Sequence, residues 1–93
     1  MYRKRYAKKF KVSMRKLLRS GYALREAVET VIETLASGKT LDRKYHDHAL
    51  TGEFKGYREC HIRPDLLLIY KIEKNVLILI LADIGSHANL FGI

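Results

Sequence analysis

The centre of this sequence is the stretch His48-Ala-Leu-Thr-Gly-Glu-Phe-Lys-Gly-Tyr-Arg-Glu-Cys-His61-Ile-Arg-Pro-Asp65-Leu-Leu-Leu-Ile-Tyr-Lys71. It holds two of the four histidines and the only proline of the chain. Residues 57–63 alternate with the period of two that is typical of a strand. His61 and Arg63 therefore share one face, and Cys60 points to the other. Pro64 and Asp65 then supply a turn, because proline pre-sets the backbone angle of an early turn position.

Two strongly apolar segments follow that turn. Residues 66–72 and 76–82 flank Glu73-Lys74-Asn75 and predict an antiparallel hairpin. Their nearly continuous hydrophobicity indicates the centre of a sheet with helices packed on one side.

The N-terminal half predicts one strand and two helices. Residues 2–6 alternate aromatic and basic side chains as a short strand, and from Ala7 the apolar residues recur at helical spacing as far as Gly21. A second helix is expected over residues 23–36, where Ser37-Gly38 ends it. Residues 39–47 show no clear period and predict an irregular connection.

The C-terminal segment predicts one short helical turn. Ser86 can cap it, and His87 and Phe91, four residues apart, then lie on the same side. We therefore expect one α+β domain over residues 1–93. An N-terminal strand and a helical hairpin would pack on a twisted, mainly antiparallel sheet of about four strands.

The chain is strongly basic, with a formal net charge of +8 and a pI near 9.8. Half of its 18 lysine and arginine residues lie within residues 1–20, which contain no acidic residue. Such a charge predicts attraction to a polyanion, since each phosphate that is neutralised releases condensed counterions. A nucleic acid or an acidic protein is the expected partner. The alternative is that the basic face is only exposed to solvent and binds no partner.

Several other classes of protein are not indicated. Cys60 is the only cysteine and can form no internal disulfide, which suits a reducing cytoplasm. The longest apolar run, residues 76–82, is far too short to span a bilayer. His46-x-His48 and Cys60-His61 lack the spacing of a metal motif, and the six glycines are scattered. We expect neither a metal nor a cofactor.

The histidines and basic residues suit RNA cleavage without a metal. That reaction needs a base for the ribose 2′-hydroxyl, an acid for the departing 5′-oxygen, and cations near the developing charge. Histidine titrates near neutrality and can fill the first two roles. The composition is compatible with this reaction but does not require it.

Four segments of the C-terminal half match a known pattern. They are Tyr45-His-Asp-His48-Ala-Leu-Thr-Gly, Lys55-Gly-Tyr-Arg-Glu-Cys-His61-Ile-Arg-Pro-Asp65, Leu68-Ile-Tyr-Lys71 and Gly85-Ser-His87-Ala-Asn-Leu-Phe91-Gly. In this order and spacing they resemble the YafQ-like branch of the RelE superfamily, bacterial toxins of type II toxin-antitoxin systems. The helical half resembles that family only in element order and charge. The resemblance implies a RelE-like fold and a metal-independent endoribonuclease that cuts mRNA in the ribosomal A site and inhibits translation.

The resemblance also implies an active site. Its residues would be His48, His61, Asp65, His87 and Phe91. We expect His87 to be the general acid, and either His48 or Asp65 to take the 2′-hydroxyl proton. His61 would orient the phosphate or stabilise its charge, and Phe91 would stack on a base.

Basic residues are candidates for RNA contacts. They are Lys8, Lys9, Lys11, Arg15, Lys55, Arg58 and Arg63. Of these, Arg63 shares the predicted face of His61 and Arg58 does not. The expected partners are a cognate antitoxin, mRNA and the 70S ribosome with its rRNA, and operator DNA only through the antitoxin complex. No membrane is expected.

Two alternatives remain open from the sequence. A non-catalytic nucleic-acid-binding module would depend on lysine and arginine and would ignore the loss of His87. A gyrase-inhibiting toxin of the ParE branch would share the fold. That branch lacks the histidine set, so that His48, His61 and His87 argue against it.

Overall fold

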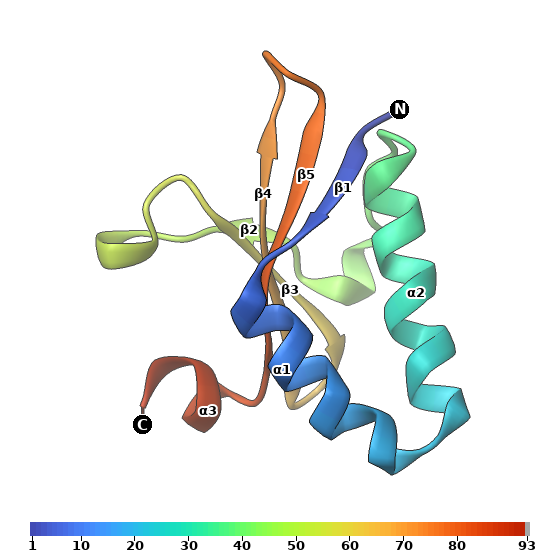
Figure 1. The fold of residues 1–93 in the computed structure, drawn as a ribbon. Coiled ribbons are helices and arrows are strands. Elements are labelled where there is room, and N and C mark those ends of the chain that lie inside the picture. The colour runs from blue at the N-terminus through green and yellow to red at the C-terminus, as the bar shows by residue number, and fades with distance from the viewer. Residues whose placement is uncertain (93) are drawn as a thin grey trace.

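A five-stranded sheet with the strand order β1-β5-β4-β3-β2 forms the middle of the molecule (Figure 1). The computed structural model describes residues 1–92. The strands are β1 (Arg3–Tyr6), β2 (His48–Ala49), β3 (Arg58–Arg63), β4 (Leu66–Glu73) and β5 (Ile78–Gly85). The helices are α1 (Lys8–Leu17), α2 (Tyr22–Ala36) and α3 (His87–Phe91), with short 3-10 turns at Leu18–Ser20, Arg43–Tyr45 and Gly52–Phe54.

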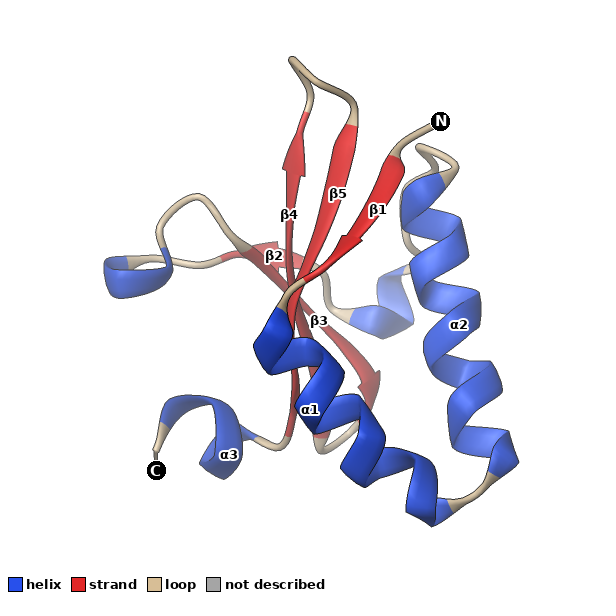
Figure 2. Cartoon of the chain, viewed as in Figure 1, coloured by secondary structure: helices blue, strands red, loops and turns tan. Residues whose placement is uncertain are grey.

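The sheet is mixed, because β1 runs parallel to β5 and the other neighbours are antiparallel (Figure 2). The α+β class and the element order are confirmed. The expected count of about four strands is one too low, because β2 has only two residues, too few to show a period of two. This strand nevertheless matters for the site, since it sets His48 opposite Glu59.

The main core lies between the sheet and the helices α1 and α2. Val28, Val31 and Leu35 are buried along α2, at the helical spacing that the sequence shows. They meet side chains from alternate positions of the sheet strands, including Cys60, Leu68, Tyr70, Leu79 and Leu81. Burying each large apolar side chain contributes about 1.5–3 kcal/mol, so this layer holds the sheet against the helices.

The two helices begin and end close to the predicted residues. α1 is followed by the 3-10 turn Leu18–Ser20, and Gly21 leaves it with φ 118°, a backbone angle that favours glycine. Ser37 closes α2. Within residues 1–92, no helix combines the length and apolar character needed to cross a bilayer.

The predicted strand over residues 76–82 is wrong at both ends. Val76 and Leu77 belong to the turn of the hairpin, where Leu77 has φ 54° and the two side chains are 60% and 49% exposed. At the other end the ladder continues to Gly85, opposite Leu67, after a register shift between Ile69 and Tyr70. Apolar composition alone cannot locate a turn built from apolar residues. Because β5 runs on to Gly85, α3 begins directly after the end of this strand.

Candidate active site

The face of the sheet turned away from α2 carries Glu59 and His61 of β3. Alternation along β3 places Cys60 fully inside the main core, and Glu59 and His61 on the opposite face. On the neighbouring strand, Leu67 and Ile69 are also buried but lie outside the main core, which fixes them on the Glu59 side. His61 therefore points away from Cys60, as the sequence predicts. α3 lies on this face (Figure 1).

The other three histidines of the chain lie around His61. The centroid of its ring is 5.6 Å from that of His46, 5.9 Å from that of His87 and 6.5 Å from that of His48. These side chains come from the loop before β2, from β2, β3 and α3. The fold thus joins residues that are far apart in the sequence.

Glu59 lies between two of these histidines. Its Oε2 is 2.9 Å from Nε2 of His48, and its Oε1 is 3.7 Å from Nε2 of His87. The Glu59 side chain is only 6% exposed, and among the described residues its Oε1 has no hydrogen-bond partner. A buried carboxylate is costly unless positive charge or donors compensate it, and the two imidazoles are the groups placed to do so.

Both ring nitrogens of His48 have a partner, and these contacts orient the ring. Nδ1 is 2.7 Å from the carbonyl oxygen of His46, which can only accept, so Nδ1 carries a hydrogen. Nε2 lies 2.9 Å from Oε2 of Glu59. His46 adopts a left-handed φ of 48°, which is uncommon for a residue other than glycine.

α3 presents His87 and Phe91 on one side, as predicted. Oγ of Ser86 accepts a hydrogen bond of 3.2 Å from the backbone N–H of Asn89 and caps the helix. The rings of His87 and Phe91 have centroids 5.8 Å apart. Phe91 also meets the ring of Phe54 edge-on, with centroids 5.4 Å apart. The histidine cluster thus ends in a pair of aromatic rings.

The remaining site candidates lie at unequal places. Asp65 is exposed in the turn between β3 and β4, after Pro64. Arg63 lines a cavity together with His48 and His61. Lys55 is exposed and follows the turn that carries Phe54.

Arg58 is engaged elsewhere. Its Nη2 lies 3.2 Å from Oδ2 of Asp47, and the Tyr70 hydroxyl donates to the same carboxylate. The hydrogen bond to Asp47 raises the pKa of the Arg58 guanidinium. Burial first, and then the hydrogen bond that its own hydroxyl donates to Asp47, raise the pKa of Tyr70. The structure therefore places Arg58 in a network that ties the loop before β2 to the sheet, away from the histidine face.

Cys60 is unsuited to nucleophilic chemistry. It is completely buried, and burial raises the pKa of its thiol to about 12. In the part of the chain that the structure describes, no three histidine, cysteine or acidic side chains meet in an arrangement that could hold a metal ion.

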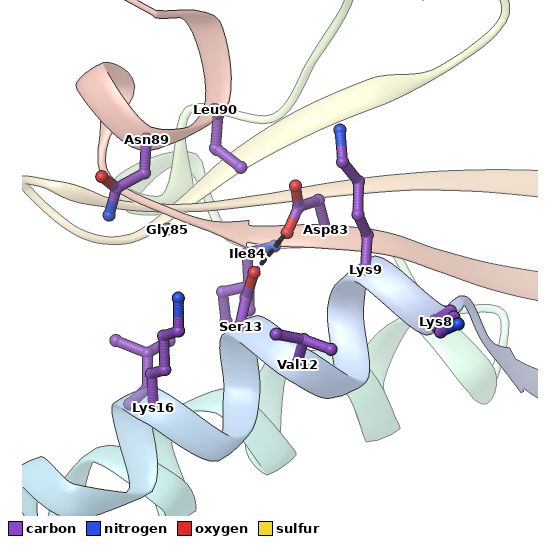
Figure 3. A pocket seen from close by; sticks show the side chains of 11 residues that line it. Lys8, Lys9, Val12, Ser13, Lys16, Asp83, Ile84, Gly85, Asn89 and Leu90 are labelled. Atoms are coloured by element: carbon purple, nitrogen blue, oxygen red, sulfur yellow. Dashed lines mark hydrogen bonds between the residues drawn. The ribbon is translucent and has the colours of Figure 1, made fainter.

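The four basic residues of α1 that the sequence indicates as RNA contacts form a different surface. Lys8 and Lys9 line a cleft of about 560 Å³ between α1, the end of β5 and α3 (Figure 3). In this cleft Oγ of Ser13 donates a 2.8 Å hydrogen bond to Oδ1 of Asp83. Lys11 and Arg15 are exposed on the same helix. We call these four basic residues the α1 basic surface.

Three residues of the histidine face were not predicted from the sequence. The sequence pattern could have indicated Glu59, because alternation places it on the face of His61 and an acidic residue is unusual in a central strand. His46 is exposed, as expected, but its ring also lies against that of His61. Nothing in the sequence indicates Phe54, since its contact with Phe91 joins a 3-10 turn to α3, which is distant in the sequence.

Known proteins are similar to this chain in sequence and fold. Residues 2–92 match the family model described as bacterial toxin of type II toxin-antitoxin system, YafQ. The chain belongs to the YafQ toxin family. The resemblance carried by the four C-terminal segments is thereby confirmed.

Two YafQ relatives match over part of their length. The chain is 55% identical over 42 residues to the putative toxin YafQ of Haemophilus influenzae, covering 45% of this chain and 41% of that protein. It is 48% identical over 48 residues to the mRNA interferase toxin YafQ of Escherichia coli K12, covering 52% of this chain and 50% of that protein. The chain thus spans about half the length of the curated relatives it matches.

Solved toxin structures match over nearly the whole chain. A metal-bound toxin from Helicobacter pylori superposes with a TM-score of 0.90 at 41% identity, covering 98% of this chain and 100% of that one. The toxin in the E. coli DinJ-YafQ complex gives a TM-score of 0.85 at 30% identity, covering 99% and 100%. The fold of this chain is therefore that of the YafQ toxins.

Proposed function

We propose that this chain is a ribosome-dependent endoribonuclease toxin that cuts mRNA in the ribosomal A site by metal-independent acid–base catalysis. The observation that carries the proposal is the buried Glu59 carboxylate held between His48 and His87 on an accessible face. The name of the E. coli relative, an mRNA interferase toxin, supports the same reaction class.

The reaction divides between the two ends of the histidine cluster. The 2′-hydroxyl of one nucleotide loses its proton to a base and attacks the neighbouring phosphorus. The phosphorus–5′-oxygen bond then breaks, and the 5′-oxygen takes a proton from an acid. We assign His87 as the acid and His48 or Asp65 as the base. Positioned acid–base groups of this kind contribute about 10²–10⁴-fold to a rate.

Glu59 couples the two histidines through its charge. After each cleavage the base holds one proton more than before, and His87 holds one fewer. With His48 as the base, the Glu59 carboxylate, which faces both Nε2 atoms, balances the positive charge that moves from one ring to the other.

The neighbouring side chains bind and orient the RNA. The ring of His61 is surrounded by the other three imidazoles, and a proton on it would stabilise the negative charge that builds on the phosphate. Arg63 and Lys55 are suited to flanking phosphates. Phe91, supported by the edge of Phe54, offers a ring on which a base can stack.

The proposal includes partners. One relative, the E. coli YafQ toxin, has been solved as a DinJ-YafQ complex, which supports a cognate antitoxin for this chain. The α1 basic surface suits both an acidic antitoxin and ribosomal RNA, because either would relieve its unopposed positive charge. Operator DNA would be bound only through the antitoxin complex.

Primer extension on an mRNA incubated with the purified protein tests the reaction. We expect discrete, codon-phased cuts that require translating ribosomes and disappear in His87→Ala. If folded wild-type protein leaves the mRNA intact both with and without ribosomes, the proposed endoribonuclease activity is refuted. Binding and DNA-supercoiling assays would then separate the nucleic-acid-binding module from the gyrase inhibitor.

A further inference from the structure

A cavity opens beside the histidines. It has a volume of about 720 Å³, within the usual range for small-molecule sites. Besides His48 and His61, it is lined by Lys44, Tyr45, His46, Ile62, Arg63 and Pro64. We call it the 46/63 cavity.

The lining of the 46/63 cavity has the chemistry of a nucleotide site. Tyr45, Ile62 and Pro64 supply apolar surface, and the His46 ring adds a second aromatic group. Lys44 and Arg63 bring positive charge, and Nζ of Lys44 lies 5.2 Å from the centroid of the Tyr45 ring. Aromatic rings for a base beside cations for its phosphate are the usual means of binding single-stranded RNA.

The order of the rings gives this site a direction. The rings of His46, His61, His87 and Phe91 follow one another with successive centroid distances of 5.6, 5.9 and 5.8 Å. The 46/63 cavity adjoins His48 and His61, whereas His87 and Phe91 do not line it. Both candidate bases belong to the cavity side, since His48 lines it and Asp65 follows Pro64 in the turn.

We propose that the 46/63 cavity binds the nucleotide on the 5′ side of the scissile phosphodiester, the one whose 2′-hydroxyl attacks. Its base packs against Tyr45 and His46, and Lys44 and Arg63 contact its phosphate. The nucleotide on the 3′ side, which leaves with the 5′-oxygen, lies toward His87 and Phe91. This assignment rests on the proposed function and gives the RNA one polarity across the site.

His46 allows a clean test, because its backbone and its ring serve different purposes. The carbonyl orients His48, and the left-handed backbone places it there. Asparagine tolerates the left-handed conformation far better than most residues do. His46→Asn therefore keeps the carbonyl in place and removes the ring from the cavity.

The experiment uses the full chain and short mRNAs on programmed ribosomes, in which the nucleotide 5′ or 3′ of the mapped cut has lost its base. For the wild type, the 5′ abasic RNA should lower kcat/KM about tenfold, the scale of one lost stacking contact. His46→Asn should lower kcat/KM on intact RNA by a similar factor. For this variant, kcat/KM on the 5′ abasic RNA should be nearly the same as on intact RNA. Its response to the 3′ abasic RNA should equal that of the wild type.

A charge-matched pair completes the test. Lys44→Gln should raise KM, whereas Arg43→Gln, which alters an exposed neighbour outside the cavity lining, should not. Equal effects of the two variants, or a wild type indifferent to the 5′ base while it still cuts intact RNA, would overturn the subsite alone. No cutting of intact RNA by the wild type would remove the proposed function and the subsite with it.

Discussion

Single residues in this chain take their chemistry from the face of the strand on which they stand. Glu59, Cys60 and His61 are consecutive, yet Cys60 is sealed in the core while its two neighbours face the histidine cluster. A shift of the strand by one residue would exchange these environments completely. The register of β3 against β4 is therefore as important for the site as the identity of its side chains.

Glu59→Gln should remove the negative charge between His48 and His87 with little change of shape. Glutamine keeps the length of the side chain but cannot balance the positive charge on the two rings, so we expect the single-turnover cleavage rate to fall about 100-fold. Rapid-quench cleavage of ribosome-bound mRNA measures it. Glu53→Gln, at an exposed glutamate, is the matched control. Equal rates for the two variants would show that Glu59 has only a structural role.

Cys60 should be inert in the native protein. Because burial raises the pKa of its thiol from 9.0 to about 12, almost no thiolate exists near pH 8. Iodoacetamide should label Cys60 only in denaturant, as mass spectrometry can determine.

The raised pKa of the Cys60 thiol also has a consequence for stability. Between pH 9.0 and about 12 the unfolded thiol ionises while the folded one does not, so this contribution to stability is full below that window and declines across it.

Rapid labelling of folded protein at pH 8 would contradict the buried thiol. Urea titrations at pH 8 and pH 10, with Cys60→Ala as the reference, isolate the thiol contribution from other groups that titrate in the same range.

Among the elements, the loop before β2 depends on one polar network. Asp47 accepts from Arg58 and from the Tyr70 hydroxyl, both on central strands, and it directly precedes His48. This network holds a two-residue strand that could not persist alone. Asp47→Asn should lower the free energy of unfolding by about 1–3 kcal/mol, the cost of leaving partly buried partners unsatisfied.

A double-mutant cycle checks that assignment. Tyr70→Phe removes the other end of one bond, and urea denaturation of both single variants and the double variant gives their coupling. If Asp47 and Tyr70 act together, the effects of the two substitutions should add to clearly more than the effect of the double variant. Strict additivity would show that the contact contributes nothing to stability.

The same elements show what the sequence could and could not predict. The helices, the faces of β3 and the cap at Ser86 follow from local periodicity and hydrogen-bonding chemistry, and these predictions are confirmed. The start of β5 was misjudged because Val76 and Leu77 are apolar turn residues. Contacts of His46 with His61, and of Phe54 with Phe91, depend on how separate loops fold back on the sheet. No local pattern encodes them.

For the whole molecule, the distribution of charge separates association from cleavage. The formal net charge is +8, and the α1 basic surface lies in or beside a different cleft from the one that adjoins His48 and His61. Charges remote from the reacting groups act mainly on encounter with a polyanion, and their effect declines as salt screens them. Chemistry at the histidine cluster should be much less sensitive to salt.

Lys11→Gln/Arg15→Gln should therefore weaken ribosome binding without slowing cleavage at saturating ribosome concentration. Each phosphate contact that is lost reduces the slope of log K against log salt by about 0.7–0.9, so we expect a shallower salt dependence than in the wild type. Co-sedimentation with ribosomes over a salt series measures the slope. Lys39→Gln/Lys74→Gln removes the same charge from exposed positions outside α1. If both double variants shift the slope equally, net charge alone explains the binding. A change confined to the α1 variant identifies that surface as the one that meets the ribosome.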